Sequence, residues 1–415
     1  MRAEEDRLFR PAQAQSIEET GLPPNLVFDL VLKHAFFEGA VTLDKLAQQS
    51  KLSPAVLHSI YRQFQKQQLC ETRTMIGDDY EISLSARGRE MAEIALRKNH
   101  YVGQAPVSLS DYNRAVKAQA MEIQVTADSL QSKLQDLVLP DSLIHELGAA
   151  LVTGGAIVLY GTTGNGKTSI AERLQRLSDD LIYVPYAVEV SGQIISVYDP
   201  LIHRAEPQDN GLEDLRWVLC RRPMVKVGGE LRADMLDTRV DEATRINIAP
   251  IHMKANNGIL LIDDFGRQRL TPRELLNRWI VPLDRGTDVL SLWSGVSFEI
   301  PFQVLVVFAT NLPLSDLAED AFMRRLKSKI KIEPLDDDHF RELLRRVSAA
   351  KGIGCSPAME DIIVKECARH CPDGLRACFP ADLMEIVAGI AKFEQRAPVL
   401  ERAEVERALK LYFVH

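Results

Sequence analysis

Two polar segments in the middle of the chain, each following an apolar run, have the residue types that bind and cleave a polyphosphate. The first follows residues 156–160 and matches the pattern G-x-x-x-x-G-K-[ST]. Glycines allow backbone N–H groups to wrap phosphates, and the N-terminus of a following helix adds partial positive charge. The predicted nucleotide-binding residues are therefore Gly161, Thr162, Thr163, Gly164, Asn165, Gly166, Lys167, Thr168 and Ser169.

The last residues of this loop and a second, acidic segment have separate expected roles. The ammonium of Lys167 can reach the β- and γ-phosphates of ATP, and the Thr168 hydroxyl can join the coordination shell of Mg²⁺. Asp263 and Asp264 follow the apolar run 259–262. We expect Asp263 to hold Mg²⁺ through water and Asp264 to orient or deprotonate the attacking water. The alternatives are a chance glycine turn and an ordinary acidic turn, and the occurrence of both motifs together argues against them.

The elements that must hold these residues alternate between strands and helices. Residues 156–160, 258–262 and 304–310 are apolar runs of strand length, each followed by polar residues, and a helix is predicted to begin near Lys167. This alternation predicts an α/β fold with a parallel sheet flanked by helices. The region after Pro334 has a helical pattern throughout, so we expect a separate helical subdomain there.

The first two motifs indicate a P-loop NTPase, and the region from about residue 139 to the C-terminus resembles the AAA+ superfamily. Residues 304–311 resemble sensor 1, which implies that Asn311 lies beside the attacking water and the γ-phosphate. Residues 317–326 resemble the junction that carries the arginine finger, for which Arg325 is favoured over Arg324. The alternatives are a common polar strand end and two solvated cations at a helix end.

Two further features bear on this resemblance. Residues 289–300 are expected to form a hairpin that turns near Ser294 and Gly295, ahead of sensor 1. Such hairpins contact substrate in the ring pore in some AAA+ clades, and a plain β-excursion is the alternative. The family places an arginine early in the third lid helix, where this chain has Ala381, with Arg376 slightly upstream. This departure leaves open how the lid senses the phosphates and is compatible with slow hydrolysis.

A smaller unit precedes the P-loop region. Residues 23–98 have the pattern of a helix, a second helix, a third helix opened by Ser53-Pro54, a hairpin turning over 76–79 and a final helix, and this order resembles a winged-helix domain. Residues 1–98 contain 13 Lys and Arg against 14 Asp and Glu. Because cations that neutralise phosphates supply most nucleic-acid affinity, a protein-binding role is favoured over DNA binding.

The predicted organisation is an N-terminal arm (1–22), a winged-helix-like domain (23–98), a polar linker (99–138), an α/β nucleotide-binding subdomain (139–335) and a helical lid (336–415). The stretch 215–241 contains Arg221, Arg222 and Lys226, and we expect an irregular loop whose basic residues are solvated, with a pore or partner contact as the alternative.

The composition is that of a globular protein, with 46% hydrophobic and 26% charged residues and a net charge of −8 among 415 residues. Six scattered cysteines do not form a disulfide framework. No apolar run approaches the roughly 20 residues that cross a bilayer, and residues 1–11 lack the apolar core of a signal peptide. We therefore expect a cytoplasmic location without membrane insertion.

The favoured function is ATP hydrolysis by an AAA+ ATPase that uses Mg-ATP at the subunit interfaces of a ring to remodel a protein partner. The ring is expected to be a homo-oligomer, hexameric when ATP is bound. One alternative is a nucleic-acid machine, such as a loader, transposition factor or transcription regulator, with the winged helix on DNA. The other is a slow ATP-dependent switch.

Overall fold

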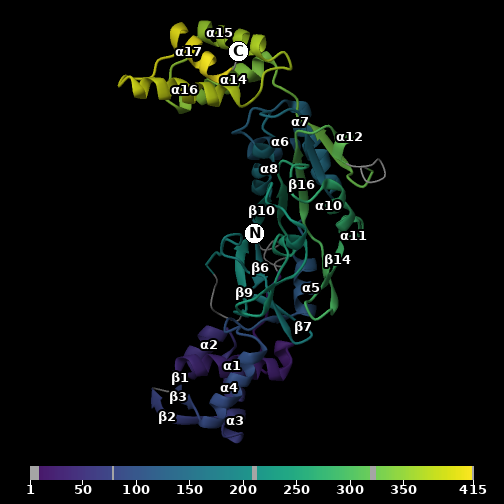
Figure 1. The fold of residues 1–415 in the computed structure, drawn as a ribbon, viewed down its shortest axis with the longest axis vertical. Coiled ribbons are helices and arrows are strands. Elements are labelled where there is room, and N and C mark those ends of the chain that lie inside the picture. The colour runs from purple at the N-terminus through teal and green to yellow at the C-terminus, as the bar shows by residue number, and fades with distance from the viewer. Residues whose placement is uncertain (1–8, 77–78, 208–212, 318–323, 414–415) are drawn as a thin grey trace.

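The computed structural model describes residues 9–76, 79–207, 213–317 and 324–413. These residues form an elongated molecule with four units stacked along its long axis (Figure 1). The N-terminal unit lies at one end, a β-rich unit and an α/β module lie in the middle, and a helical lid lies at the other end. Among the described residues, no helix has the length and apolar character needed to cross a membrane.

The α/β module is built on a five-stranded parallel sheet with strand order β10-β13-β16-β5-β17. Side chains alternate between its two faces: Val158 and Phe308 belong to one apolar cluster, and Leu159 and Val307 belong to the other. Since both faces are covered, the three inner strands β13, β16 and β5 are almost wholly apolar, whereas the edge strand β17 has two lysines. This confirms the α/β class predicted from the sequence. The strands are β5 (Ile157–Tyr160), β10 (Met224–Val227), β13 (Ile259–Ile262), β16 (Leu305–Thr310) and β17 (Ser328–Lys331).

Helices cover the two faces of this sheet. One face packs against α6 (Ala127–Lys133), α7 (Asp141–Thr153), α8 (Lys167–Arg173) and the short helix η3 (Leu174–Leu177). The other face packs against α9 (Ile251–Lys254), α10 (Pro272–Arg278), α11 (Ile280–Arg285), α12 (Leu314–Leu317) and η4 (Ala233–Leu236). Helix α10 has a capping box, in which the Thr271 hydroxyl accepts from the Glu274 N–H and the Glu274 carboxylate accepts from the Thr271 N–H.

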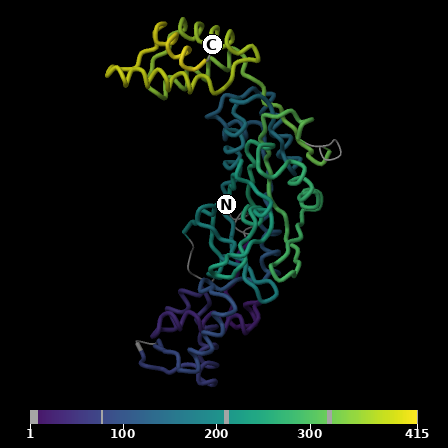
Figure 2. Tube along the Cα trace, viewed as in Figure 1, coloured from purple at the N-terminus to yellow at the C-terminus, as the bar shows by residue number. Residues whose placement is uncertain are grey.

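The β-rich unit is a second fold element that the sequence did not reveal. Its sheet has the order β11-β12-β8-β7-β4, and two antiparallel pairs, β6-β9 and β14-β15, complete it. Figure 2 shows that blue, teal and green segments, which are far apart in the sequence, meet in this unit. Its elements are β4 (Val107–Ser108), α5 (Leu109–Ala118), β6 (Leu181–Pro185), β7 (Ala187–Val190), β8 (Gln193–Ser196), β9 (Trp217–Arg221), β11 (Arg239–Asp241), β12 (Ile246–Ile248), β14 (Thr287–Ser291) and β15 (Ser297–Pro301).

This unit changes two of the expected domain limits. The segment 99–138, expected to be a linker, contains β4, α5 and α6, and its residues Tyr112 and Leu130 are buried in two different apolar clusters. The region 139–335, expected to be one subdomain, contributes to two separate cores. The polar composition of 99–138 hid the few apolar positions at helical spacing that anchor these helices.

The β-rich unit joins the α/β module through a clasp at its two ends. Strand β6 pairs with β9, so that Leu181 lies opposite Arg221. Directly outside this pair, Arg222 forms a two-point ion pair with Asp180 and also donates to the carbonyls of Gln119 and Asn257. Arg222 was expected to be solvated but is 9% exposed, because its guanidinium donates hydrogen bonds to all these acceptors inside the junction.

The N-terminal unit has three packed helices, a fourth helix and a three-stranded antiparallel sheet with the order β1-β3-β2. Helix α3 begins at Pro54 with Ser53 as its N-cap, as the sequence predicted. Gly77 and Asp78 of the expected hairpin turn lie outside the described residues, and assignment as a winged helix remains a prediction. The elements are α1 (Pro24–Glu38), β1 (Ala40–Thr42), α2 (Leu43–Ser50), α3 (Pro54–Lys66), β2 (Cys70–Ile76), β3 (Asp79–Leu84) and α4 (Ala86–Lys98).

The described part of the N-terminal arm, residues 9–22 with the short helix η2 (Glu18–Thr20), straps this unit to the β-rich unit. Phe9 packs edge-on against Trp217 of β9, with ring centroids 5.6 Å apart. The Asp214 N–H donates to the Pro11 carbonyl, and the Ser53 hydroxyl donates to the Ala14 carbonyl.

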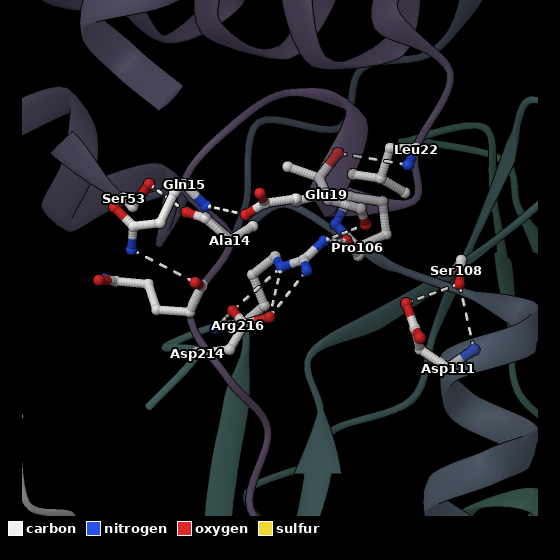
Figure 3. A network of polar contacts seen from close by, with 12 residues as sticks. Ala14, Gln15, Glu19, Leu22, Ser53, Pro106, Ser108, Asp111, Asp214 and Arg216 are labelled. Atoms are coloured by element: carbon white, nitrogen blue, oxygen red, sulfur yellow. Dashed lines mark hydrogen bonds and ion pairs between the residues drawn. The ribbon is translucent and has the colours of Figure 1, made fainter. Parts of the chain in front are cut away.

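A buried arginine lies at the centre of this strap (Figure 3). Arg216 is 4% exposed, and its guanidinium forms a two-point ion pair with Asp214. Its Nη1 donates to the Thr20 carbonyl at 2.9 Å and to the Pro106 carbonyl at 3.0 Å. One side chain therefore links the arm, the start of β4 and the β-rich unit.

The helical lid consists of α14 (Asp337–Ala350), α15 (Pro357–His370), α16 (Phe379–Phe393) and α17 (Arg402–Tyr412) around its own apolar cluster. Cys367 and Cys371 are buried in this cluster as free thiols. Among the described residues, no group of three or more metal-ligating side chains is present.

Candidate functional site

The glycine-rich loop joins the end of β5 to the start of α8. Gly161 has a φ of 139°, and a Cβ at this position would lie 2.3 Å from the Ile332 carbonyl oxygen. Gly166 caps α8 in a left-handed conformation. Gly161 must be glycine because the loop passes close to the Ile332 backbone, and Gly166 is favoured because of its left-handed conformation. The loop leads directly into the N-terminus of α8.

Lys167 lies on the loop itself in this structure. Its Nζ donates to the carbonyls of Gly161 at 2.9 Å and Thr162 at 2.8 Å, and the residue is 9% exposed. Burial lowers the pKa of the Lys167 ammonium, while the carboxylates of Asp264 and Asp263 act in the opposite direction. The ammonium is thus held by exchangeable carbonyl contacts a few ångströms from where phosphates bind in such loops.

The two residues predicted to hold Mg²⁺ meet directly. The Thr168 hydroxyl donates to Asp263 Oδ1 at 2.9 Å. A third residue, which the sequence reasoning missed, lies on the other carboxylate oxygen: Lys226 Nζ is 3.3 Å from Asp263 Oδ2 and donates to Glu172 at 2.9 Å. A hydroxyl and a carboxylate suit Mg²⁺, and the ammonium shows that this carboxylate already attracts a cation. The residues therefore fit the metal.

Asp264 and Asn311 lie at the ends of neighbouring strands β13 and β16. Asp264 is exposed and has a φ of 48°, an unusual conformation for a residue other than glycine. Asn311 Nδ2 donates to the Thr163 hydroxyl at 2.9 Å, and its buried Oδ1 has no partner among the described residues. An amide oxygen that lacks a donor, next to an exposed carboxylate, is suited to orient a water molecule.

These residues line one cavity of about 990 Å³ between the α/β module and the lid. Residues Thr163 to Ser169 contribute to its wall, as do Asp263, Asp264 and Asn311. The lining also includes apolar residues that the sequence reasoning did not identify: Leu137, Val138, Leu139, Pro140, Leu143, Leu335, Leu343 and Val347. Polar groups for phosphates and apolar groups for a base in one cavity fit a nucleotide. In the sequence, the apolar run 137–139 could have indicated this apolar part of the cavity.

The lid reaches the glycine-rich loop through a backbone hydrogen bond. The Cys378 N–H, at the start of α16, donates to the Gly164 carbonyl at 2.9 Å. A Cβ on Gly164 would lie 2.6 Å from the Cys378 sulfur. The loop and the lid are therefore packed as closely as this glycine permits.

Ala381 lines the cavity, at the position where the resemblance leads one to expect an arginine. Arg376 lies beside Gly164 and packs on Phe379, and its guanidinium carbon is 5.9 Å from that ring's centroid. Its Nε is buried without a hydrogen-bond partner among the described residues. This donor is thus available next to the loop.

Arg325 lies elsewhere. Its Nε donates to Asp284 of α11 at 3.0 Å, and its side chain is 35% exposed. Neither Arg325 nor the exposed Arg324 belongs to the described lining of the cavity. Residues 318–323 of the expected junction lie outside the described residues.

The remaining expectations concern the hairpin and the basic stretch. The hairpin forms as β14 and β15, and Gly295 in its turn has a φ of 84°. The stretch 215–241 is not irregular throughout, since it contains β9, β10 and β11. Arg221 is largely exposed and pairs with Glu206, whereas Arg222 is buried and Lys226 lies at the candidate metal site.

Comparisons with known proteins give limited information. A family model described as a domain of unknown function (DUF8689) matches residues 336–411, which are the lid helices. The comparison with curated proteins gives no match. Similar solved structures include three substituted forms of RuvB from Thermotoga maritima. The first is 12% identical, and the match covers 69% of this chain and 71% of that chain. The second is also 12% identical, and the match covers 72% of each chain. The third is 11% identical, and the match covers 69% of this chain and 70% of that chain.

The TM-score is 0.36 for each of these three structures. Similarity at this level carries nothing about activity. What supports a nucleotide site is the chain's own parallel sheet, with the loop and the acidic strand end at the same edge.

Proposed function

We propose that this chain is an AAA+ ATPase that binds and hydrolyses Mg-ATP at the subunit interfaces of a ring oligomer and uses the cycle to remodel a protein partner. The observation that carries the proposal is the meeting of Lys167, Thr168, Asp263, Asp264 and Asn311 around one cavity. Each comes from the carboxyl end of a parallel strand or the helix that follows it, which is where such sheets bind ligands.

Each side chain has a role that its position supports. Lys167 exchanges its two carbonyl acceptors for phosphate oxygens. Thr168 and Asp263 hold Mg²⁺, directly and through water, and the bound metal neutralises charge on the β- and γ-phosphates. Asp264 orients or deprotonates the attacking water, and Asn311 Oδ1 accepts a hydrogen bond from it. The apolar part of the cavity receives the base.

The ring is proposed from the position of Arg325. A guanidinium stabilises the charge that develops on the γ-phosphate, yet Arg325 lies outside its own cavity. If the Arg325 of one subunit enters the nucleotide cavity of its neighbour, its position outside its own cavity is explained. Its contact with Asp284 is half-exposed and exchangeable, so a neighbour's phosphate can replace it. A hexamer is the proposed assembly.

A protein partner is proposed over nucleic acid because the N-terminal unit presents few cations. The exposed face of α3 has Arg62 and Lys66 but no further lysine or arginine. DNA binding depends on several phosphate contacts from lysine and arginine. In this proposal the N-terminal unit is a winged-helix domain that contacts protein.

Activity across subunits tests the proposal. The Asp264→Asn and Arg325→Ala variants should each be inactive in ATP hydrolysis, with Arg324→Ala as the matched control that keeps activity. An equimolar mixture of the two inactive variants should regain about a quarter of wild-type activity, since that share of interfaces combines an intact Asp264 with an intact Arg325. Full activity of isolated monomers, or a mixture that stays inactive, would contradict the ring.

The partner is tested with the Asp264→Asn variant in ATP, which should retain the nucleotide and trap the assembled state. A protein retained with ATP and lost with ADP supports remodelling. Nuclease-sensitive DNA or RNA retained instead would favour a nucleic-acid machine.

A further inference from the structure

A second cavity lies at the junction of the N-terminal unit and the β-rich unit, far from the nucleotide site along the molecule (Figure 1). Its volume is about 1080 Å³, similar to that of the nucleotide cavity. One wall comes from α1 and the residues at the end of α4. The other wall comes from the β7–β8 turn, β11, the β11–β12 turn and the tip of the β14–β15 hairpin. We call it the interdomain groove.

The walls of this groove are fixed relative to each other. His100 donates its backbone N–H to the Thr244 carbonyl at 2.8 Å, and Arg245 Nη1 donates to the Arg97 carbonyl at 3.3 Å. The arm and the buried Arg216 hold the same two units together. The groove is therefore preformed, which reduces the entropy cost of binding.

The hairpin tip presents an aromatic ring over this groove. Trp293 is 83% exposed, whereas the other two tryptophans, Trp217 and Trp279, are 3% and 0% exposed. The tip does not hang free, because Gln193 Nε2 donates to the Ser294 hydroxyl. An indole held rigidly in water at the rim of a cavity is a binding surface rather than a packing residue.

The floor and one edge of the groove suit an extended chain. Leu26 packs against the cluster that contains Ile194, so an apolar floor bridges the two units. Strand β11 is the last strand of its sheet and leaves one edge unpaired, and its central residue Val240 is exposed toward the groove. An unpaired strand edge offers backbone donors and acceptors to an added strand.

A buried acceptor gives an independent indication of a ligand. Asn247 lines the groove and is 3% exposed. Its Nδ2 donates to Gln193 Oε1 at 3.2 Å, but its Oδ1 has no partner among the described residues. A buried amide oxygen without a donor is costly, and an N–H group of a bound peptide would satisfy it.

Charge selects the kind of peptide. The lining includes three cations, Lys33, Lys98 and Arg245, and two carboxylates, Asp29 and Glu242. Lys98 already pairs with Asp29 at 2.8 Å. Lys33 is buried beneath the floor with only neutral acceptors, and burial lowers its pKa to about 8 although Asp29 acts in the opposite direction. With three cations against two carboxylates, the lining has one positive charge in excess, which favours an acidic segment.

We propose that the interdomain groove binds an extended polypeptide segment that alternates acidic and apolar side chains, with an apolar side chain against Trp293 and its backbone along β11. This inference rests on the proposed function in one respect, since it names the kind of protein segment that the ATPase engages. A single-stranded nucleic acid is disfavoured, because the apolar floor at Leu26 and Ile194 suits apolar side chains rather than a sugar–phosphate backbone.

The test uses the full chain without nucleotide. The probe is a nine-residue peptide of alternating glutamate and valine, acetylated and amidated, and its matched control has lysine in place of glutamate. The glutamate peptide should protect Trp293 from quenching by acrylamide, because the other two tryptophans are already buried. It should bind at least about tenfold more tightly than the lysine peptide.

Variants locate the site by the anisotropy of a labelled glutamate peptide. Trp293→Ala and Arg245→Glu should each weaken binding about tenfold, while Val289→Ala, on the same hairpin and 54% exposed, should not change it. Equal binding of both peptides, unchanged affinity in Trp293→Ala, or stronger protection of Trp293 by a fifteen-nucleotide oligothymidine would overturn the proposal. Since hydrolysis is measured separately, loss of peptide binding with intact ATPase activity refutes only the groove, and the reverse result refutes only the ATPase.

Discussion

The two ends of the molecule are attached to its middle in different ways. At the N-terminal end, the arm, the buried Arg216 and several backbone hydrogen bonds fix one unit to the next. At the lid end, the contacts with the α/β module include the Cys378 N–H to Gly164 carbonyl bond, the Arg346 guanidinium to Gln135 carbonyl bond and the Leu335 N–H to Leu375 carbonyl bond. The lid also has an apolar cluster of its own.

The difference indicates which end moves. Local opening has a low free energy where few buried contacts must break, and a high one where buried polar groups would be left without partners. We therefore expect the lid to open and close over the nucleotide cavity while the N-terminal unit and the β-rich unit move together.

The largest expected effect concerns the fixed end. Arg216→Met leaves the carboxylate of Asp214 buried without its partner, so the free energy of unfolding should fall by about 3–5 kcal/mol in chemical denaturation. The matched control is Arg221→Met, whose 66% exposed side chain pairs with Glu206 and should cost less than about 1 kcal/mol. Adding Asp214→Leu should recover much of the loss. Equal effects of the two arginine variants would remove the distinction between the ends.

The next effect concerns the moving end. Gly164→Ala places a Cβ 2.6 Å from the Cys378 sulfur and should lower the rate of ATP hydrolysis at least about tenfold by keeping the lid from closing. Gly155→Ala is the matched control, since it has the same φ of 86° and open space around its Cβ. Gly164→Ala can also slow hydrolysis by disturbing the nucleotide-binding loop itself. Adding Cys378→Ala removes the clash with the lid and so separates this cause from the contact between lid and loop. If the double variant is no faster than Gly164→Ala, the lid contact is not the reason.

The smallest effect concerns the candidate metal site between the two ends. Lys226→Met removes the ammonium that competes for Asp263, so the Mg²⁺ concentration for half-maximal activity should fall about threefold. Its side chain is 46% exposed, and Lys45→Met, at 51% exposed and paired with Glu38, is the control. A rise in the required Mg²⁺ would instead mean that Lys226 orients Asp263 for the metal.

Sequence reasoning could predict what local patterns determine. The strand ends before Gly161, Asp263 and Asn311 follow from short apolar runs and the polar residues after them, and the hairpin at 289–300 follows from alternation and Gly295. The α/β class follows from the order of these elements. The roles assigned to the site residues remain predictions.

The rest depended on contacts between distant segments. The β-rich unit pairs β4 with β7 and β12 with β8, and nothing in any one segment specifies its partner. Lys226 became part of the site because β10 lies beside β13 in a parallel pair. Arg222 looked solvated because its acceptors, Asp180, Gln119 and Asn257, are remote in sequence.

The clasp around Arg222 has a structural consequence. Asp180 and Arg222 lie directly before β6 and after β9, so their ion pair closes this part of the β-rich unit just ahead of β10. Arg222 also holds the Asn257 carbonyl, just ahead of the acidic strand β13. Strands β10 and β13 thus begin beside this junction, and toward their carboxyl ends they carry Lys226 and Asp263.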